Sequence, residues 1–329
     1  MRGKSARCGV VAALVCLSAA GIAFAQSPAK PYRIGWLGDG TPASGAAQSA
    51  EFQQSLREAG YVEGRNLVIE YRYAGGNAEK LPGLAAELVR VPVDVIVTSG
   101  EPAALAAARA TKTIPVVVTQ IGMDPVKAGL VTSLGRPEGN ITGLATLSDD
   151  LWEKRLGLLK EFAPKVSRLG VLWNPANPGN AGCVDQIKVA AGLRLQVVSL
   201  EVRDAGALER AFASMAGGPV DAVAICWDTL LLGRAAAIAD FALKNRLPTI
   251  APLKEYVEAG CLVSLGVSLP AHRRRAAYYV DKILKGAKPA NLPVERAAQF
   301  DLVINMNTAK ALGLAPPATM LVLADDVIR

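Results

Sequence analysis

The 329-residue sequence contains a single histidine, His272. A catalytic triad of the Ser-His-Asp or Cys-His kind would have to use it, and no nucleophile motif accompanies it. His272 stands at the start of an expected helix beside Arg273, Arg274 and Arg275, and we interpret it as a surface residue of that helix. The scarcity of histidine argues against a hydrolase, which is kept as the enzymatic alternative.

Ligand sets for metals and phosphate-bearing cofactors are also missing. No pair of cysteines or histidines has the spacing of a zinc site. Gly38, Gly40 and Gly45 follow the first expected strand, but they have neither the dinucleotide spacing nor the lysine of a P-loop. We expect no cofactor and no metal, and we interpret the glycines as a tight turn that lets a ligand approach the backbone.

Cysteine is scarce, with five residues in the chain. Cys8 and Cys16 fall in the N-terminal segment, and Cys183, Cys226 and Cys261 remain beyond it. An odd number without close spacing argues against a disulfide framework. We therefore expect packing alone to stabilise the fold.

The first 25 residues have the three-part pattern of an export signal. Basic Arg2, Lys4 and Arg7 precede the apolar run 9–22, and cleavage is expected after Ala25. A membrane anchor is the less favoured alternative, because the run is shorter than the ~20 residues of a spanning helix. Lipid attachment is disfavoured too, since the residues before Cys16 are not small. We expect export to the periplasm with residues 1–25 removed.

Charge gives little sign of a macromolecular partner. Without residues 1–25 the net charge is +4, because 33 basic residues then face 29 acidic ones. The surplus is spread along the chain, so no nucleic-acid partner is expected. No later segment offers 18 uninterrupted apolar residues.

Short β-rich runs alternate with amphipathic stretches, which predicts an α/β fold with parallel sheets. Strands are expected at 32–37, 67–73, 93–98, 116–119, 168–173, 195–199, 222–227, 248–251, 261–265 and 302–304. Helices are expected at 46–59, 80–89, 103–110, 151–161, 181–191, 207–215, 235–244 and 272–284. Two successive sets of this kind predict two Rossmann-like lobes. Lobe one comprises 31–144 with about 268–300, and lobe two comprises 145–267 with about 301–329. The glycine-rich segment 135–146 is the expected first crossing of a multi-strand hinge.

Candidate ligand-binding residues follow the expected strands, because open α/β sheets bind ligands at the carboxyl ends of their strands. In lobe one they are Trp36, Gly38, Asp39, Ser99, Gly100, Glu101, Gly122 and Asp124. In lobe two they are Trp173, Asn174, Asn177, Trp227, Asp228 and Tyr256. The three tryptophans could form an apolar wall of the site or simply close the core.

Several segments resemble one family, the substrate-binding proteins of ABC transporters that include the tryptophan-binding TrpX-like receptors. They are 61–72, 81–97, 102–105, 124–126, 139–144, 173–175, 280–293 and 302–314. The resemblance implies a type I periplasmic binding fold, whose two lobes close over a small ligand. It further implies an amino acid as ligand, with an aromatic one as first candidate, and a monomer that docks transiently on an ABC permease in the inner membrane.

Two positions decide which ligand such a site would take. Asp228 could bind an α-ammonium group or could cap the helix that follows it. Where relatives usually read Gly-Thr-Pro-Ala, this chain has Glu101 after Gly100. If Glu101 points outward, Ser99 and the amides of residues 100 and 101 favour a carboxylate. If it points inward, the site instead suits a cationic or amide-bearing ligand.

Three further functions are weighed against an importer receptor. A periplasmic sensor for a receptor kinase would have the same cleft. A repressor of the same fold would need a DNA-binding head, for which the chain leaves no room before its first strand. The hydrolase lacks its motifs, so we expect a protein that is not an enzyme.

Overall fold

The computed structural model describes residues 30–146, 151–192, 194–297 and 300–329. The expected leader and its cleavage site lie outside these residues. Pro31–Arg329 form one compact unit. Within it the strands assemble into two sheets.

The first sheet has the strand order β11-β5-β4-β3-β1-β2, and every neighbouring pair is parallel. Its strands are β1 (Tyr32–Gly38), β2 (Leu67–Tyr73), β3 (Val95–Ser99), β4 (Val116–Ile121), β5 (Ile141–Ala145) and β11 (Glu295–Arg296). All the residues of β3, β4 and β5 are buried. Such continuous apolar runs are typical of parallel strands that are covered on both faces.

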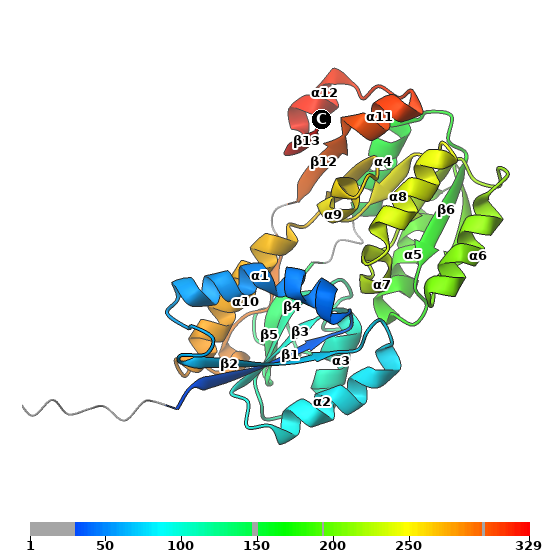
Figure 1. The fold of residues 1–329 in the computed structure, drawn as a ribbon. Helices are drawn as coiled ribbons and strands as arrows, with labels where there is room; N and C mark the ends of the chain where they lie inside the picture. The colour runs from blue at the N-terminus through cyan, green and yellow to red at the C-terminus, as the bar shows by residue number, and fades with distance from the viewer. Residues whose placement is uncertain (1–29, 147–150, 193, 298–299) are drawn as a thin grey trace, which may run out of the picture. The chain divides into compact units, whose positions relative to one another are not determined.

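Helices cover both faces of this sheet (Figure 1). On one face α1 (Pro42–Glu58) packs beside α10 (Leu269–Leu284), and on the other α2 (Leu81–Arg90) packs beside α3 (Glu101–Ala110). Alternate side chains of β3 divide between the two layers, since Val95 and Val97 pack with α1 and α10 while Ile96 packs with α2 and α3. Short 3-10 turns, Ala78–Lys80 and Pro289–Asn291, precede α2 and β11.

The second sheet has the order β13-β12-β10-β9-β8-β6-β7. Its strands are β6 (Arg168–Trp173), β7 (Gln196–Glu201), β8 (Ala222–Ile225), β9 (Thr249–Ala251), β10 (Val263–Gly266), β12 (Asp301–Asn305) and β13 (Asp326–Ile328). The pair β10 and β12 is antiparallel, and the other pairs are parallel. Two strands at one edge of this sheet, β12 and β13, come from the C-terminal part of the chain.

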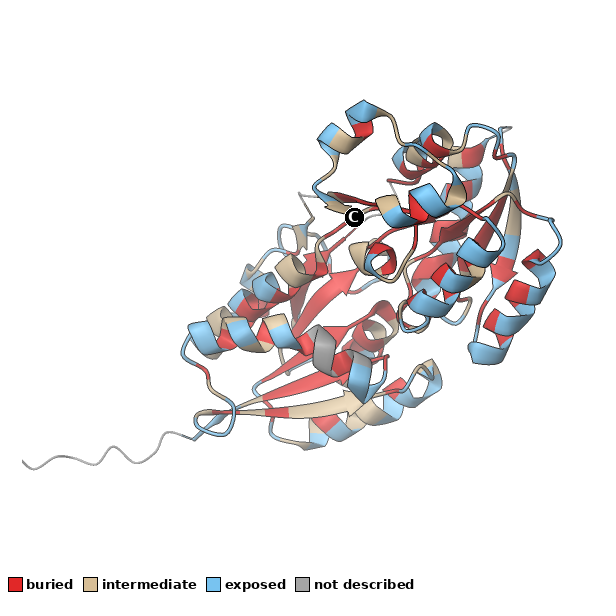
Figure 2. Ribbon diagram, turned by 45° about the horizontal axis from the view of Figure 1, so that its top comes forward, coloured by how far each residue is buried: buried red, intermediate tan, exposed pale blue. Residues whose placement is uncertain are grey.

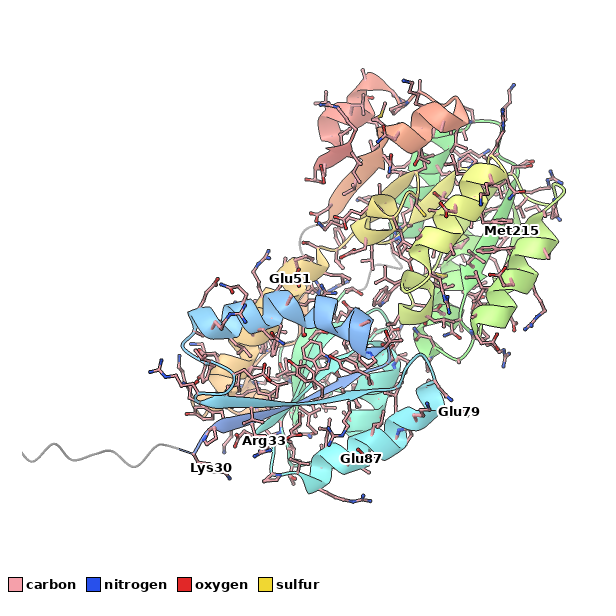
Figure 3. The ribbon with its side chains drawn as sticks, in the orientation of Figure 1. Lys30, Arg33, Glu51, Glu79, Glu87 and Met215 are labelled. Atoms are coloured by element: carbon pink, nitrogen blue, oxygen red, sulfur yellow. A yellow bond between two sulfur atoms is a disulfide. The ribbon has the colours of Figure 1, made fainter. Side chains whose placement is uncertain are left out.

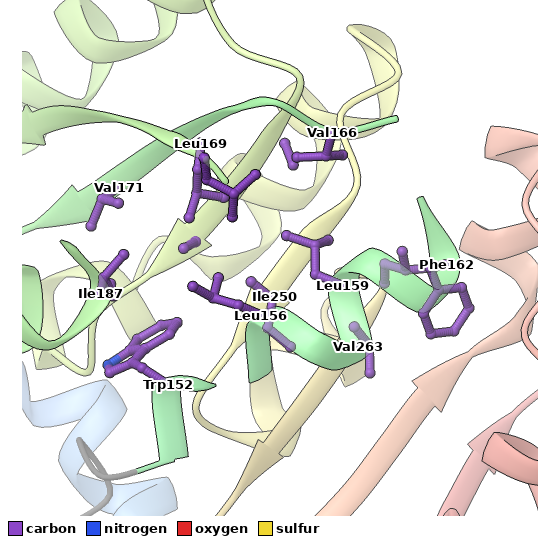
Figure 4. Packing of buried hydrophobic residues seen from close by; sticks show 14 of the residues in the cluster. Trp152, Leu156, Leu159, Phe162, Val166, Leu169, Val171, Ile187, Ile250 and Val263 are labelled. Atoms are coloured by element: carbon purple, nitrogen blue, oxygen red, sulfur yellow. The ribbon is translucent and has the colours of Figure 1, made fainter. Parts of the chain in front are cut away.

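Helices also cover both faces of the second sheet. They are α4 (Trp152–Phe162), α5 (Pro178–Ala191), α6 (Ala205–Met215), α7 (Thr229–Leu232), α8 (Ala235–Lys244), α9 (Lys254–Glu258), α11 (Met306–Leu312) and α12 (Ala318–Leu323). One apolar layer joins α4 and α5 to the sheet, with Leu156 and Leu159 packed near Leu169 and Val171 of β6 (Figure 4). A second layer joins α6 and α8 to the opposite face. Figure 2 shows the buried strands between helices whose outer faces are exposed.

The structure corrects the expected position of the first connection between the lobes. Segment 135–146 contains β5, a buried strand that pairs with β4, so the chain stays in the first sheet as far as Ala145. Gly143 supports this close packing, since a Cβ there would lie 2.2 Å from the carbonyl oxygen of Val118. The chain passes between the sheets after β5, after β10 and after β11.

The expectation of a fold without disulfides is also wrong. Cys183 on α5 and Cys226 after β8 form a disulfide with a Cα–Cα distance of 6.2 Å, and Cys261 is free and buried. The three cysteines beyond the leader argued against a disulfide because their number is odd, but two of them are paired and the third is free. The partners are 43 residues apart, and only the packing of α5 over β8 brings them together.

Candidate functional site

Polar residues from both sheets surround a small cavity at the carboxyl ends of the strands. Its volume is about 20 Å³, space for little more than one water molecule. It is lined by Asp39, Gly76, Ala78, Pro102, Asn174, Ala176, Asn177, Asp228, Thr229 and Leu230. Four of the predicted site residues, Asp39, Asn174, Asn177 and Asp228, thus meet here, and a solute can enter only if the walls part.

Asp39 follows β1 and is 8% exposed. Its Oδ1 has no hydrogen-bond partner among the described residues, while its side chain bonds to Thr229. Burial, together with the charges of Asp228 and Glu101, raises the pKa of Asp39 to about 7. A cavity wall therefore holds a carboxyl group with an acceptor oxygen still open.

Glu101 opens α3 and points inward, with an exposed fraction of 2%. Its Oε1 accepts hydrogen bonds from the amides of Gly122 at 2.7 Å and Met123 at 3.1 Å. A Cβ on Gly179, at the N-terminus of α5, would lie 2.7 Å from the same carboxyl group. The inward alternative for Glu101 is the one that the structure adopts.

Asp228 is buried and caps α7, with Oδ1 accepting from the amide of Leu230 at 2.9 Å. The side-chain amide of Asn174 donates to both carboxylate oxygens at 3.3 Å, and that of Asn177 donates to Oδ2 at 3.0 Å. Burial raises the pKa of Asp228, and these hydrogen bonds oppose the rise. The capping role is therefore present, and the same carboxylate also lines the cavity.

The three candidate tryptophans lie elsewhere. Trp36 is 1% exposed and packs against Phe52 in the core, with ring centroids 5.2 Å apart. Trp173 is half-buried and donates from Nε1 to Ser199 Oγ at 2.7 Å. Trp227 is half-buried against the α6 and α8 layer. None of the three lines the cavity formed by the described residues, and the core-closing alternative holds for Trp36.

The other candidates are not among the residues that line the cavity. Gly100 has φ +95°, and a Cβ there would lie 2.3 Å from Asp39 Oδ2, so only glycine fits beside that carboxyl. Tyr256 is fully buried and its hydroxyl donates to the carbonyl of Asp228 at 3.5 Å. Ser99 is buried at the end of β3, and Gly38 lies against Tyr73. Asp124 caps a turn by accepting from the amide of Val126 at 2.9 Å.

Two larger cavities are also present. One, of about 660 Å³, is lined by Gly122, Asp124 and Gly179 among others, and the second, of about 640 Å³, includes Thr229, Glu255 and Arg273. Sequence reasoning missed Thr229 and Asn180. Asn180 Oδ1 accepts from the Asn174 amide at 2.9 Å, and its Nδ2 donates to the Trp227 carbonyl at 2.8 Å. The cluster of three asparagines from 174 to 180 was the available signal.

His272 is corrected from a surface residue to a half-buried one. Burial lowers its pKa, which favours the neutral imidazole. Among the described residues, no group of three histidine, cysteine or acidic side chains could hold a metal ion. Every helix that the structure describes is too short or too polar to span a bilayer.

Comparison with known proteins gives one consistent result. A family model described as ABC transporter substrate binding protein matches residues 43–328. The tyrosine-binding protein of Clostridioides difficile (strain R20291) is 29% identical over 265 residues, which are 80% of this chain and 75% of that protein.

Solved structures agree. A conserved domain protein from Vibrio cholerae has a TM-score of 0.84 at 30% identity and covers 91% of this chain and 100% of its own. An ABC domain in complex with L-Trp from Streptococcus pneumonia has a TM-score of 0.82 at 26% identity, with the same coverage. The isoleucine complex of LivJ from Streptococcus pneumoniae, at 14% identity and a TM-score of 0.57 over 86% of this chain and 88% of its own, shares the fold alone. The expected type I periplasmic binding fold is thereby confirmed.

Proposed function

Because the chain belongs to the ABC transporter substrate binding proteins, we propose that it is the solute receptor of an ABC importer and carries out no chemistry itself. Its ligand is a small solute with an ammonium group, and its size is that of an amino acid. The observation that carries this proposal is the buried acidic cavity at the strand ends, where Asp39 and Asp228 meet. The tyrosine and tryptophan named for the two relatives support a small solute that carries an ammonium group.

Asp228 is the proposed ammonium acceptor. Its carboxylate is held in place by Asn174 and Asn177, so binding costs little reorganisation of the site. A charge-assisted hydrogen bond from an ammonium group would also satisfy Oδ1 of Asp39, a residue that lines the same cavity. The two lobes would then close around the ligand by a hinge motion.

The remaining features of the proposal rest on the leader pattern and on the resemblance to the receptor family. The leader pattern of residues 1–25 supports export to the periplasm. There the monomeric receptor docks on an inner-membrane permease after closure. A periplasmic sensor that presents the closed complex to a receptor kinase is the second candidate, since it would use the same cavity.

Native mass spectrometry of the purified protein tests the proposal. We expect a retained small molecule whose mass identifies the solute. Replacing Asp228 with Asn should weaken its binding by about 2–5 kcal/mol in calorimetry, the usual cost of removing one partner of a buried charge pair. Asn can still accept from the Leu230 amide, so the variant separates ligand binding from helix capping. A variant that binds as tightly as the parent would refute the role of Asp228.

A further inference from the structure

We propose that the ligand is an organic cation without a carboxylate, such as a diamine or a guanidino amine, because the protein's own carboxylates occupy the positions that would receive a ligand carboxylate. The inference rests on the proposed receptor function and narrows its ligand class. It is carried by the geometry of Glu101, Asp39 and Asp228.

Glu101 fills the first of these positions. In parallel α/β sheets a ligand carboxylate is received by backbone amides at strand ends and helix N-termini. The amides of Gly122 and Met123 follow β4, and both donate to Glu101 Oε1. The same carboxyl group lies against Gly179 at the start of α5. A ligand carboxylate brought to this place would meet the buried Glu101 carboxyl group rather than free amides.

The neighbouring helix N-termini are filled as well. The Gly179 amide of α5 donates to Asn177 Oδ1 at 3.1 Å, and the Leu230 amide of α7 donates to Asp228. At the start of α3, the Asp39 carboxyl lies so close to Gly100 that it excludes a Cβ. The N-termini of α3, α5 and α7 therefore each lie next to a side-chain oxygen of the protein itself.

Positive charge is what the cavity lacks. None of the described residues that line this 20 Å³ cavity is basic, whereas Lys127 and Arg296 line the larger cavity at Gly122 and Gly179. Asp39 lines the cavity and is more than nine-tenths buried. Its Oδ1 has no hydrogen-bond partner among the described residues, an arrangement that costs free energy until a donor arrives. Ammonium and guanidinium groups are donors that accept nothing, so they match this surface of acceptors.

Three pairs of compounds that differ by a single carboxylate give the test: 1,5-diaminopentane with L-lysine, agmatine with L-arginine, and tryptamine with L-tryptophan. Calorimetry with the wild-type receptor should show at least one amine binding at least tenfold more tightly than its amino acid. If L-lysine, L-arginine or L-tryptophan binds more tightly than its amine, or if no amine binds, the inference is overturned. The receptor function is judged separately by the retained molecule in native mass spectrometry.

Two variants of Glu101 distinguish its charge from its shape. Glu101→Gln keeps an acceptor for Gly122 and Met123 but loses the charge, so amine binding should weaken at least tenfold. Glu101→Thr, the residue expected in relatives, frees both amides and should raise the affinity of the amino acid relative to its amine at least tenfold. Unchanged preferences in both variants would overturn the inference.

Glu87→Gln is the matched control. Glu87 is an exposed residue of α2 (Figure 3). It pairs with Arg72 at 2.9 Å. Its removal changes the net charge by the same amount at a site outside the cavity, and the preferences should stay those of the wild type. A loss of amine binding here as large as in Glu101→Gln would indicate a general charge effect and overturn the inference.

Discussion

At the scale of single residues, the cavity depends on acidic groups in a low-dielectric environment, and no basic residue is among the described residues that line it. Asp39 has its pKa raised to about 7, first by burial and then by Asp228. A carboxyl in this state is protonated in the folded protein over a pH range in which it is ionised in the unfolded chain. Its titration therefore couples folding and ligand binding to pH.

We predict that this coupling is visible in the stability of the ligand-free protein. The folded state binds more protons than the unfolded state between pH 4 and 7, so the free energy of unfolding should fall as pH rises through this window. The shift of Asp39 corresponds to a loss on the order of 4 kcal/mol. Urea unfolding at several pH values should show that Asp39→Asn lacks this component, and identical pH profiles for the two proteins would contradict the prediction.

The sequence could place most of the acidic residues at the site but not their orientation. Polar residues after parallel strands meet at one edge of the sheet, which is why Asp39 and Asp228 could be predicted together. Whether Glu101 points in or out depends on the backbone of Gly100 and on the amide of Gly122, which lies 21 residues away in the sequence. The direction of Trp36 depends on the pleat of β1, and no spacing in the sequence reveals it.

At the scale of secondary-structure elements, α5 holds one side of the site. It carries the cap Asn177 and the close contact at Gly179, and Cys183 ties its second turn to the end of β8. The disulfide therefore joins the helix that contacts Glu101 to the strand that leads to Asp228. Alternating strand and helix patterns predicted both elements, whereas the covalent link depends on their packing in space.

Breaking the disulfide should destabilise the protein without abolishing the fold. Cross-linking two positions 43 residues apart stabilises by about 2–4 kcal/mol, mainly by restricting the unfolded chain. Cys183→Ala should lower the free energy of unfolding by this amount and make the melting temperature insensitive to reductant. Cys261→Ala is the control, because it leaves the disulfide intact, and its melting temperature should still fall on reduction. A wild-type melting temperature that reductant does not change would contradict the prediction.

The short strand β5 is an element that the sequence pattern did not predict. Its five residues include one glycine, Gly143, and follow a glycine-rich loop, so the segment was interpreted as a connection between the lobes. In the structure, Gly143 with φ +133° permits the closest approach to β4. Tertiary packing, rather than local propensity, makes this stretch a strand.

At the scale of the whole molecule, the chain joins its two sheets through several passages, and the site residues come from both. Asp39 follows β1 of the first sheet, and Asp228 lies between β8 of the second sheet and α7. The repeated strand and helix pattern predicted two sets, because each set needs its own core. The predicted lobe limits, 31–144 with 268–300 and 145–267 with 301–329, remain a proposal about which parts move together.

Closure upon the ligand is the prediction that tests those lobes. With a volume of about 20 Å³, the cavity cannot admit a solute, so a ligand must enter while the walls are apart and be enclosed afterwards. Small-angle scattering of the purified protein should show a smaller radius of gyration with saturating ligand than without it. The forward intensity should correspond to one chain in both states, as expected of a receptor that presents its lobes to a permease. Glu87→Gln should contract like the parent, whereas Asp228→Asn should need more ligand to do so. An unchanged radius at saturation would exclude a closing clamp, and a dimer mass would exclude the monomeric receptor.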